Sequence, residues 1–214
     1  AAASDVYKRQ TLTRALSAPD ASTRLRAALA AGTAPEADFV DPLVQRCAVE
    51  PDFFVRDMLT WALTRLPAEV AVPRLVVELS STRAQARSQA LHTLSKIGDG
   101  SAWPAITDDL LHDTDTEVAR AAWRAAVVLA PADEHSALAS TLAREFGRGD
   151  TEVQRSLSRA FVTLGEAASS AVTTALRHPD PSVRAHAQAT RRLMDDPESD
   201  FETDLALARK VVAC

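Results

Sequence analysis

Two stretches of the chain that share one pattern decide the fold. Residues 113–126 read DTDTEVARAAWRAA, and residues 149–161 read GDTEVQRSLSRAF. In each, an acidic residue precedes Thr-Glu-Val, and apolar or small residues then recur every three or four positions, as on one face of an amphipathic helix. An aspartate placed before such a run accepts hydrogen bonds from the free amides of a helix start. Both stretches therefore predict a helix that is buried along one side.

Further copies of this pattern occur at a nearly constant spacing. Residues 51–56 (PDFFVR) and 179–184 (PDPSVR) open with Pro-Asp, and residues 86–90 (ARSQA) form a fifth copy. The sixth copy, near residue 25, is weak, and its register could shift by two residues. The first buried position of each predicted helix serves as its anchor, and these anchors are Leu25, Val55, Ala86, Val118, Val153 and Val183. Their spacings of 30, 31, 32, 35 and 30 residues indicate an internal repeat.

Each anchored helix is preceded by another apolar-periodic segment, as at residues 39–47 and 172–176. Each repeat is therefore predicted to be a helical hairpin. One hairpin cannot bury its own apolar face, whereas stacked hairpins share a continuous core. We predict an all-α array of about six hairpins over residues 11–194.

This organisation resembles the HEAT family, and in particular its short bacterial repeats of the type also found in phycobilisome lyases. The resemblance rests on the opening Asp-x-x-Val-Arg, as in residues 52–56 and 180–184, and it covers residues 11–194. It implies a right-handed α-α superhelix, or HEAT-like solenoid, in which the second helix of each hairpin lines a concave surface. It says little about function, because the same hairpin serves many unrelated binders.

The two ends of the chain are predicted to differ from the repeats. Residues 1–10 include SDVYKRQ, which resembles a translated sequencing-adaptor remnant and lacks the apolar core of a signal peptide, so we expect a non-native or disordered leader. Residues 195–214 are expected to form an acidic break followed by a capping helix. The residues of that helix that would cover the end of the core are Phe201, Leu205, Ala208 and Val212.

Composition narrows the class of protein. A net charge of −5 disfavours attraction of the whole surface to nucleic acid or anionic lipid, although a local basic patch remains open. The two cysteines, Cys47 and Cys214, make neither a disulfide framework nor a zinc site, so we expect a protein of the reducing cytoplasm. The resemblance to short bacterial HEAT repeats implies a bacterial protein. No apolar run is long enough to span a membrane.

Candidate binding residues are those two and six places after each anchor, because they point away from the buried stripe. From the second repeat onward these pairs are Asp57 and Trp61, Ser88 and His92, Arg120 and Arg124, Arg155 and Arg159, and Ala185 and Ala189. Four arginines on two neighbouring helices would form a basic square suited to carboxylates or phosphates. Trp61, His92 and Asp57 would continue this surface. The alternative is that the four arginines pair with acidic side chains of adjacent repeats, as we expect of Arg26, Arg56, Arg87 and Arg184.

The residues favour a non-enzymatic scaffold that binds an acidic or peptide-like protein partner on its concave face. The alternative is a nucleic-acid binder that uses the same arginines. A HEAT-like DNA glycosylase is disfavoured, because its Trp-Trp-Asp motif is absent: Trp61, Trp103 and Trp123 are followed by Ala62, Pro104 and Arg124. We expect no catalytic residue, cofactor or metal, since His112, Asp113 and Asp115 are better used in capping a helix.

Overall fold

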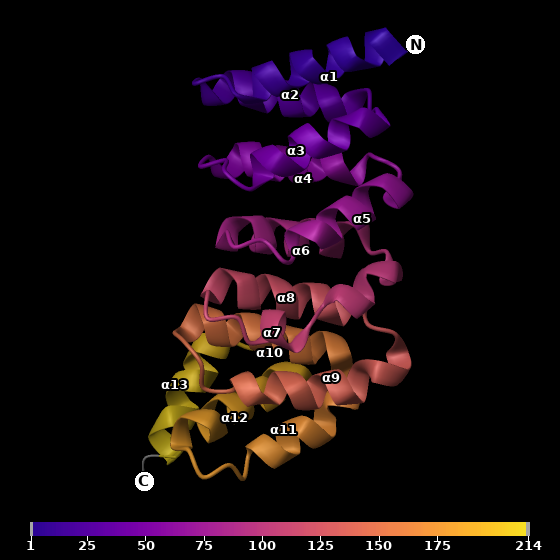
Figure 1. The fold of residues 1–214 in the computed structure, drawn as a ribbon. Coiled ribbons are helices and arrows are strands. Elements are labelled where there is room, and N and C mark those ends of the chain that lie inside the picture. Colours follow the sequence, from indigo (N-terminus) through magenta and orange to yellow (C-terminus); the bar gives the residue numbers. More distant parts are fainter. Residues whose placement is uncertain (1, 213–214) are drawn as a thin grey trace. The chain divides into compact units, whose positions relative to one another are not determined.

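The structure is a computed structural model that describes residues 2–212; Ala1, Ala213 and Cys214 lie outside the described residues. Within residues 2–212 every regular element is a helix, as predicted (Figure 1). The chain divides into two compact units, one up to Ala105 and one from Ile106. We describe them separately as the N-terminal unit and the C-terminal unit.

The N-terminal unit is a stack of three helical hairpins. The paired helices are α1 (Ala2–Leu16) with α2 (Ala21–Thr33), α3 (Val40–Cys47) with α4 (Phe53–Thr64), and α5 (Ala68–Glu78) with α6 (Ala84–Ile97). The short 3₁₀ turns η1 (Ala37–Phe39) and η2 (Gly100–Ala105) complete it. The second helices α2, α4 and α6 pack side by side in this order (Figure 1).

The C-terminal unit contains three further hairpins and a final helix. The hairpins are α7 (Asp108–Leu111) with α8 (Thr116–Leu129), α9 (His135–Leu142) with α10 (Thr151–Leu164), and α11 (Ser169–Ala175) with α12 (Pro181–Asp195). The 3₁₀ turns η3 (Ala132–Glu134), η4 (Ala143–Glu145) and η5 (Gly165–Ala168) flank α9 and α11, and α13 (Phe201–Val212) ends the unit. All six predicted hairpins and the predicted last helix are therefore present.

Aspartate caps precede five of the six second helices, whereas α6 follows Arg83 and has no side-chain cap. Asp52, Asp115 and Asp150 each accept a hydrogen bond from the backbone amide of the anchor three residues later, at 3.0, 3.1 and 3.0 Å. Asp20 makes the same bond to the amide of Thr23 at 2.8 Å. The anchor of the first repeat is therefore Thr23 and not Leu25, a shift of the two residues that the weak pattern allowed.

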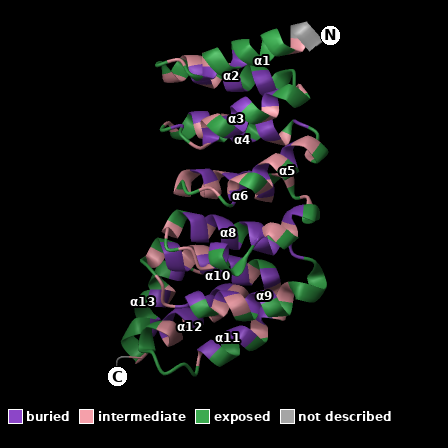
Figure 2. Ribbon diagram, in the orientation of Figure 1, coloured by how far each residue is buried: buried purple, intermediate pink, exposed green. Residues whose placement is uncertain are grey.

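Each second helix buries one face against its neighbours. In α4 the buried residues are Val55, Leu59, Thr60, Ala62 and Leu63, and Figure 2 shows buried positions along the other second helices as well. The largest fully buried side chains of the C-terminal unit, Trp123 and Phe161, come from α8 and α10. Packing between neighbouring repeats thus supplies the core of each unit.

The residue after the anchor ties each hairpin turn to its second helix. The Nη1 atoms of Arg24, Arg56 and Arg184 each donate to two backbone carbonyls five and six residues earlier, at 2.8–2.9 Å. Arg87 donates in the same way to the carbonyl of Ser81 at 2.9 Å. For Arg56 and Arg184 the prediction of pairing with acidic side chains of adjacent repeats was wrong, because turn carbonyls without a helical partner need a donor and both arginines bond to these. Among the described residues, Arg26 donates to the Thr23 hydroxyl.

Two repeats lack this arginine and replace its hydrogen bonds. In the fifth repeat Gln154 donates to the carbonyls of Gly147 and Gly149 at 3.3 and 3.2 Å. In the fourth repeat the position is Ala119, and Arg148 from the following turn donates to the carbonyls of Asp113 and Thr114 at 2.6 and 3.4 Å. The same backbone groups are therefore satisfied from a different place in the chain.

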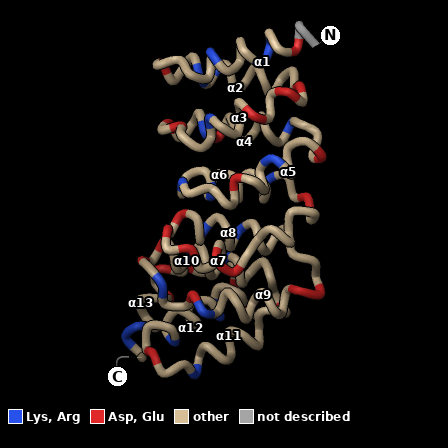
Figure 3. Tube along the Cα trace, viewed as in Figure 1, with Lys and Arg blue, Asp and Glu red and all other residues tan. Residues whose placement is uncertain are grey.

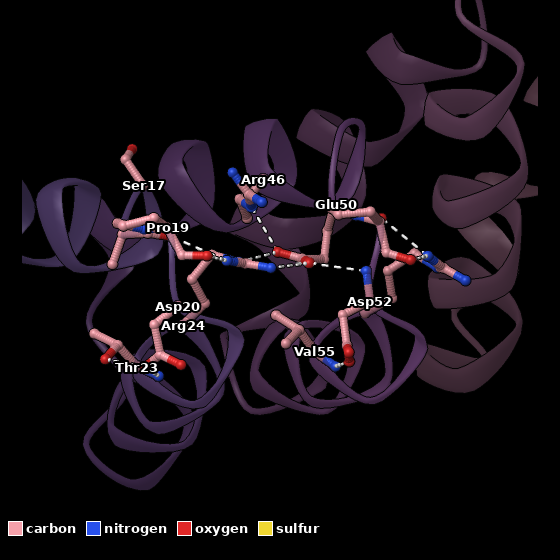
Figure 4. Close-up of polar contacts among 12 residues, drawn as sticks. Ser17, Pro19, Asp20, Thr23, Arg24, Arg46, Glu50, Asp52 and Val55 are labelled. Carbon is pink, nitrogen blue, oxygen red and sulfur yellow. Dashed lines mark hydrogen bonds and ion pairs between the residues drawn. The ribbon is translucent and has the colours of Figure 1, made fainter.

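A buried carboxylate joins the first two hairpins (Figure 4). Glu50 is fully buried and accepts from Nε and Nη2 of Arg24, at 2.8 Å each, and from Nε of Arg46 at 2.7 Å. The backbone amide of Asp52 donates to it at 2.9 Å. Burial alone would raise the pKa of Glu50, but the hydrogen bonds from Arg24, Arg46 and Asp52 outweigh burial and lower it to about 2. Glu50 is therefore an ionised structural group at neutral pH.

Helix α13 packs along the side of α12 and also reaches α10. It buries Phe201, Leu205 and Ala208, three of the four residues predicted for this purpose. Ala185 and Ala189, predicted to point away from the buried stripe, are fully buried. Ala189 belongs to the apolar cluster that Phe201 and Leu205 form with α12. The sixth repeat thus has no free surface at these two positions.

At the other end of the chain, residues 2–10 form the first part of α1. This is the segment that the sequence suggested to be a non-native or disordered leader. The helix is buried at Leu12 and Leu16, and Lys8 forms an ion pair with Glu36 at 2.7 Å. None of the helices within residues 2–212 has the length and apolar character needed to span a membrane.

Candidate functional site

The four arginines of the predicted basic square lie on two neighbouring second helices of the C-terminal unit. Arg120 and Arg124 belong to α8, Arg155 and Arg159 belong to α10, and these helices pack against each other. Both helices start with Thr-Glu-Val and bury the same face, so the arginines occupy equivalent positions two and six places after the anchors. Their guanidinium groups are therefore carried on one shared face, which we call the α8–α10 face.

One arginine of each pair is held by its own helix. Arg120 forms an ion pair with Glu117 at 3.0 Å, and Arg155 forms one with Glu152 at 3.1 Å. Arg155 also lies 3.8 Å from the carboxylate of Glu202 in α13. Both arginines are half-buried, whereas the three glutamates are largely exposed. The alternative, in which the arginines pair with acidic side chains, therefore holds for Arg120 and Arg155, two of the four arginines.

The other arginine of each pair has no such partner. Arg124 and Arg159 are exposed, and within the described residues neither guanidinium group forms a hydrogen bond or an ion pair. Partial desolvation, with repulsion from Arg120, lowers the pKa of Arg124, yet an arginine stays charged at neutral pH. Two unpaired cations at equivalent positions on adjacent helices form the central feature of the face.

The α8–α10 face is not uniformly basic. Figure 3 shows acidic and basic positions interspersed over α8, α10 and α13. Glu117, Glu152 and Glu202 partly neutralise the arginines that they contact. An anionic ligand would therefore meet two separate positive groups and no broad positive field.

A pocket of about 250 Å³ adjoins Arg155 and Arg159, between α10 and the start of α13. Its apolar lining comes from Val162, Leu193 and Phe201. Its polar lining includes Ser199, whose hydroxyl oxygen is buried without a hydrogen-bond partner in the described chain. This pocket was not foreseen, because residues 195–200 were interpreted only as an acidic break.

The remaining predicted site residues lie in the N-terminal unit. Asp57 and Trp61 are one helical turn apart on α4, both exposed, and His92 is half-buried on the adjacent α6. Trp61 is 39% exposed, and its ring lies against Gly32 of α2, where an added Cβ would come within 2.2 Å of Cζ3. Trp61 is thus partly held by the preceding repeat.

An exposed aromatic pair lies at the start of α4. Phe53 and Phe54 are both exposed, at 64% and 72%. Their rings meet edge to face, with centroids 5.5 Å apart. Both precede the anchor Val55 at the very start of α4.

One cluster in the C-terminal unit resembles a nucleophile and base but is built as structure. Ser158 Oγ lies 3.0 Å from His186 Nε2 and 2.7 Å from Thr190 Oγ1, and all three residues are fully buried. His186 Nδ1 accepts from the amide of Gly147, so Nε2 carries the proton and donates to the carbonyl of Gln154 at 2.9 Å. Burial lowers the pKa of His186 to about 4, with repulsion from Arg209 adding to this effect and the bond to Gln154 opposing it. The ring therefore has no free lone pair for the serine proton.

The residues once weighed as metal ligands also have structural partners. His112 Nδ1 forms a hydrogen bond with Glu145, which accepts from Arg148 at 2.8 Å. Asp115 caps α8, and Asp113 accepts from the backbone amide of Asp115 at 2.8 Å.

No protein-family model matches the chain, and no curated protein does so either. Among solved structures, an engineered protein is 18% identical over 90% of this chain and 99% of its own, with a TM-score of 0.49. Human deoxyhypusine hydroxylase in complex with glycerol is 16% identical over 99% and 96%, also at 0.49. The complex of CpcE and CpcF of phycocyanin lyase from Nostoc is 18% identical over 95% and 94%, at 0.42. At these TM-scores the likeness supports no conclusion about activity or partner.

Proposed function

We propose that this helical-repeat protein is a non-enzymatic scaffold that binds an acidic, peptide-like segment of a protein partner on the α8–α10 face. The observation that carries the proposal is the pair of exposed, unpartnered guanidinium groups of Arg124 and Arg159. A guanidinium binds a carboxylate through two parallel hydrogen bonds, which gives direction as well as attraction.

The spacing of the two arginines favours a segment with two separated carboxylates. Packed helix axes lie roughly 8–10 Å apart, so equivalent side chains on α8 and α10 are separated by a similar distance. Two turns of a helical peptide, or about three residues of an extended one, cover this span. Carboxylates at such a spacing could each meet one arginine.

The acidic residues within the face favour a peptide over a nucleic acid. Nucleic-acid backbones are bound by neutralising several adjacent phosphates, which needs a continuous basic surface. Here Glu117, Glu152 and Glu202 lie among the arginines and would repel neighbouring phosphates. A peptide that presents isolated carboxylates avoids this repulsion.

The two candidate nucleophiles, Ser158 and Cys47, are placed in ways that support binding over catalysis. The Ser158 and His186 pair is buried, and its imidazole already donates to a carbonyl. Burial raises the pKa of the Cys47 thiol to about 12, which disfavours the thiolate needed for nucleophilic attack.

The proposal is tested by fluorescence anisotropy with a labelled glutamate-rich peptide and a labelled single-stranded oligonucleotide of matched length. We expect the peptide to bind, and Arg124→Glu with Arg159→Glu to weaken its binding by at least about a hundredfold, since each charged hydrogen bond contributes roughly 1.5–3 kcal/mol. The matched control is Arg177→Glu with Lys96→Glu, which changes the net charge equally at two exposed positions outside the face.

The control variant should bind as the unmodified protein does. If both variants lose the same affinity for the glutamate-rich peptide, binding depends only on the net charge of the protein, and the proposal is contradicted. Preferential, steeply salt-dependent binding of the oligonucleotide would favour the nucleic-acid alternative.

In the N-terminal unit, Trp61, Asp57 and His92 are proposed as a separate partner contact. Trp61 is the residue on which this rests, because a part-exposed tryptophan held by packing is a typical anchor at protein interfaces. Trp61→Ala should weaken capture of a protein partner without changing the affinity of the glutamate-rich peptide.

A further inference from the structure

The pocket beside Arg155 and Arg159 adds a requirement to the ligand, and this inference rests on the proposed function. One wall is basic, formed by the two arginines of α10. The floor is apolar, formed by Val162, Leu193 and Phe201. A ligand that only neutralised Arg159 would leave this apolar surface in contact with water.

The pocket is smaller than most cofactor sites. Cofactor and drug sites usually measure roughly 300–1,000 Å³, and this pocket holds about 250 Å³ and is open to solvent. The hydroxyl oxygen of Ser199 is buried without a partner among the described residues. An apolar side chain next to a carboxylate matches the apolar floor and the basic wall of the pocket.

The start of α13 shows how the same surface holds such a sequence within the chain. Residues 200–202 read Asp-Phe-Glu. Phe201 is buried against Ala189 and Leu193, while the carboxylate of Glu202 lies 3.8 Å from Arg155. Four residues after Phe201, Leu205 joins the same cluster, and Asp204 forms an ion pair with Arg192 at 2.9 Å. An apolar side chain flanked by acids is thus bound directly beside the pocket.

Asp200 limits which anions the pocket accepts. Its carboxylate accepts hydrogen bonds from the Thr203 hydroxyl at 2.6 Å and from the Glu202 amide at 3.2 Å, so it is held in place at the start of α13. A negative group fixed in the pocket lining disfavours a ligand with several adjacent charges. A single carboxylate directed at Arg159 remains compatible with it.

We propose that the partner carries an acid–apolar–acid motif whose apolar side chain enters this pocket while a flanking carboxylate binds Arg159. The surface thereby distinguishes such a motif from a merely acidic segment. Recognition of the apolar residue comes from Val162, Leu193 and Phe201, and recognition of the acid comes from the arginine.

The test compares two labelled peptides that differ at one residue, Glu-Leu-Glu against Glu-Ser-Glu in the same acidic peptide. We expect the leucine peptide to bind about tenfold more tightly, the low end of what burial of a leucine side chain contributes. Ser199→Leu, which places an apolar side chain in the pocket lining, should abolish this tenfold preference. Ser136→Leu, at an exposed position of α9, is the matched control and should keep the preference.

Val162→Phe narrows the pocket from α10. If Ser199→Leu fails to fold, the same comparison of the leucine and serine peptides is made with Val162→Phe. Equal affinities of the unmodified protein for the two peptides would overturn the motif and leave the proposed function standing. Binding of neither peptide would overturn both. If Ser199→Leu and Val162→Phe both still bind the leucine peptide more tightly than the serine peptide, the apolar residue binds elsewhere and the assignment of the pocket is overturned.

Discussion

Arg24 and Glu50 form a two-bonded ion pair that connects the first and second hairpins inside the N-terminal unit, with both donor–acceptor distances at 2.8 Å (Figure 4). The side chain of Glu50 is inaccessible to solvent and that of Arg24 almost so. The same Arg24 also donates to the carbonyls of Ala18 and Pro19. One side chain therefore holds a turn and a neighbouring repeat together.

Replacing Arg24 should destabilise the protein strongly. Arg24→Met leaves Glu50 buried with only Arg46 as a charged partner, and breaking a buried pair from one side costs about 3–5 kcal/mol. Urea denaturation measures the loss. Arg26→Met, at an exposed arginine on the same helix, should change the free energy of unfolding by less than about 0.5 kcal/mol. Similar losses for both variants would contradict a special role for the pair.

An arginine introduced at position 119 should be able to replace Arg148 as the hydrogen-bond donor to the turn at residues 113–114. Arg148→Ala removes the donor from the carbonyls of Asp113 and Thr114, with an expected cost of about 1–3 kcal/mol. Adding Ala119→Arg, which restores the arginine present at this position in other repeats, should recover part of that loss. A double-mutant cycle measured by urea denaturation checks this. Additive losses would show that an arginine at position 119 does not reach the turn.

The repeat itself was readable from the sequence because helix starts leave a strong local mark. In one short segment an aspartate accepts from the amide of the anchor three residues later, and the arginine after the anchor donates to turn carbonyls. Asp52, Val55 and Arg56 show this arrangement. The first repeat was misplaced because Leu25 and Leu29 are apolar, yet Leu29 is exposed and Arg24 is buried. The Pro19-Asp20 pair, equivalent to Pro51-Asp52, was the signal that would have corrected it.

The candidate site was predictable only in part, because exposure depends on contacts between distant segments. The equivalence of Arg120 with Arg155 and of Arg124 with Arg159 follows from the repeat. That Ala185 and Ala189 lie in an apolar core depends on α13, which no periodicity in α12 could indicate. The pocket likewise requires residues 155–162 and 197–201 to meet in space.

Acidification should weaken the C-terminal unit through His186. Its pKa is about 4 when folded and 6.5 as the ordinary value, so between these values the unfolded chain binds a proton that the folded chain excludes. The contribution of neutral His186 to the free energy of unfolding is complete above pH 6.5. It is lost as the pH falls toward 4, by at most about 3 kcal/mol. The corresponding loss for Glu50 lies lower, between pH 4.5 and 2.

The check is the pH dependence of the free energy of unfolding for the unmodified protein and for His186→Gln. Glutamine keeps one acceptor and one donor but does not titrate. The difference between the two curves should change between pH 6.5 and 4, and parallel curves would contradict the assignment of His186.

Gly32 should control the position of Trp61. A Cβ at residue 32 would lie 2.2 and 2.6 Å from two ring carbons of Trp61, so Gly32→Ala must displace the indole. Overpacking of this kind costs roughly 1–3 kcal/mol and should shift tryptophan emission to longer wavelength as Trp61 becomes more exposed. Gly98→Ala meets no atom within 4 Å, although φ is +72° there, and should leave the emission unchanged. Unchanged emission of Gly32→Ala would contradict the packing described.

The most direct test of the central proposal observes the two unpartnered guanidinium groups themselves. The Nε–Hε resonances of the arginines are followed by NMR while the glutamate-rich peptide is added. The account predicts that the resonances of Arg124 and Arg159 shift most and that the resonance of Arg177 stays in place. Saturable binding with no shift at Arg124 or Arg159 would contradict it and would place the ligand on another surface.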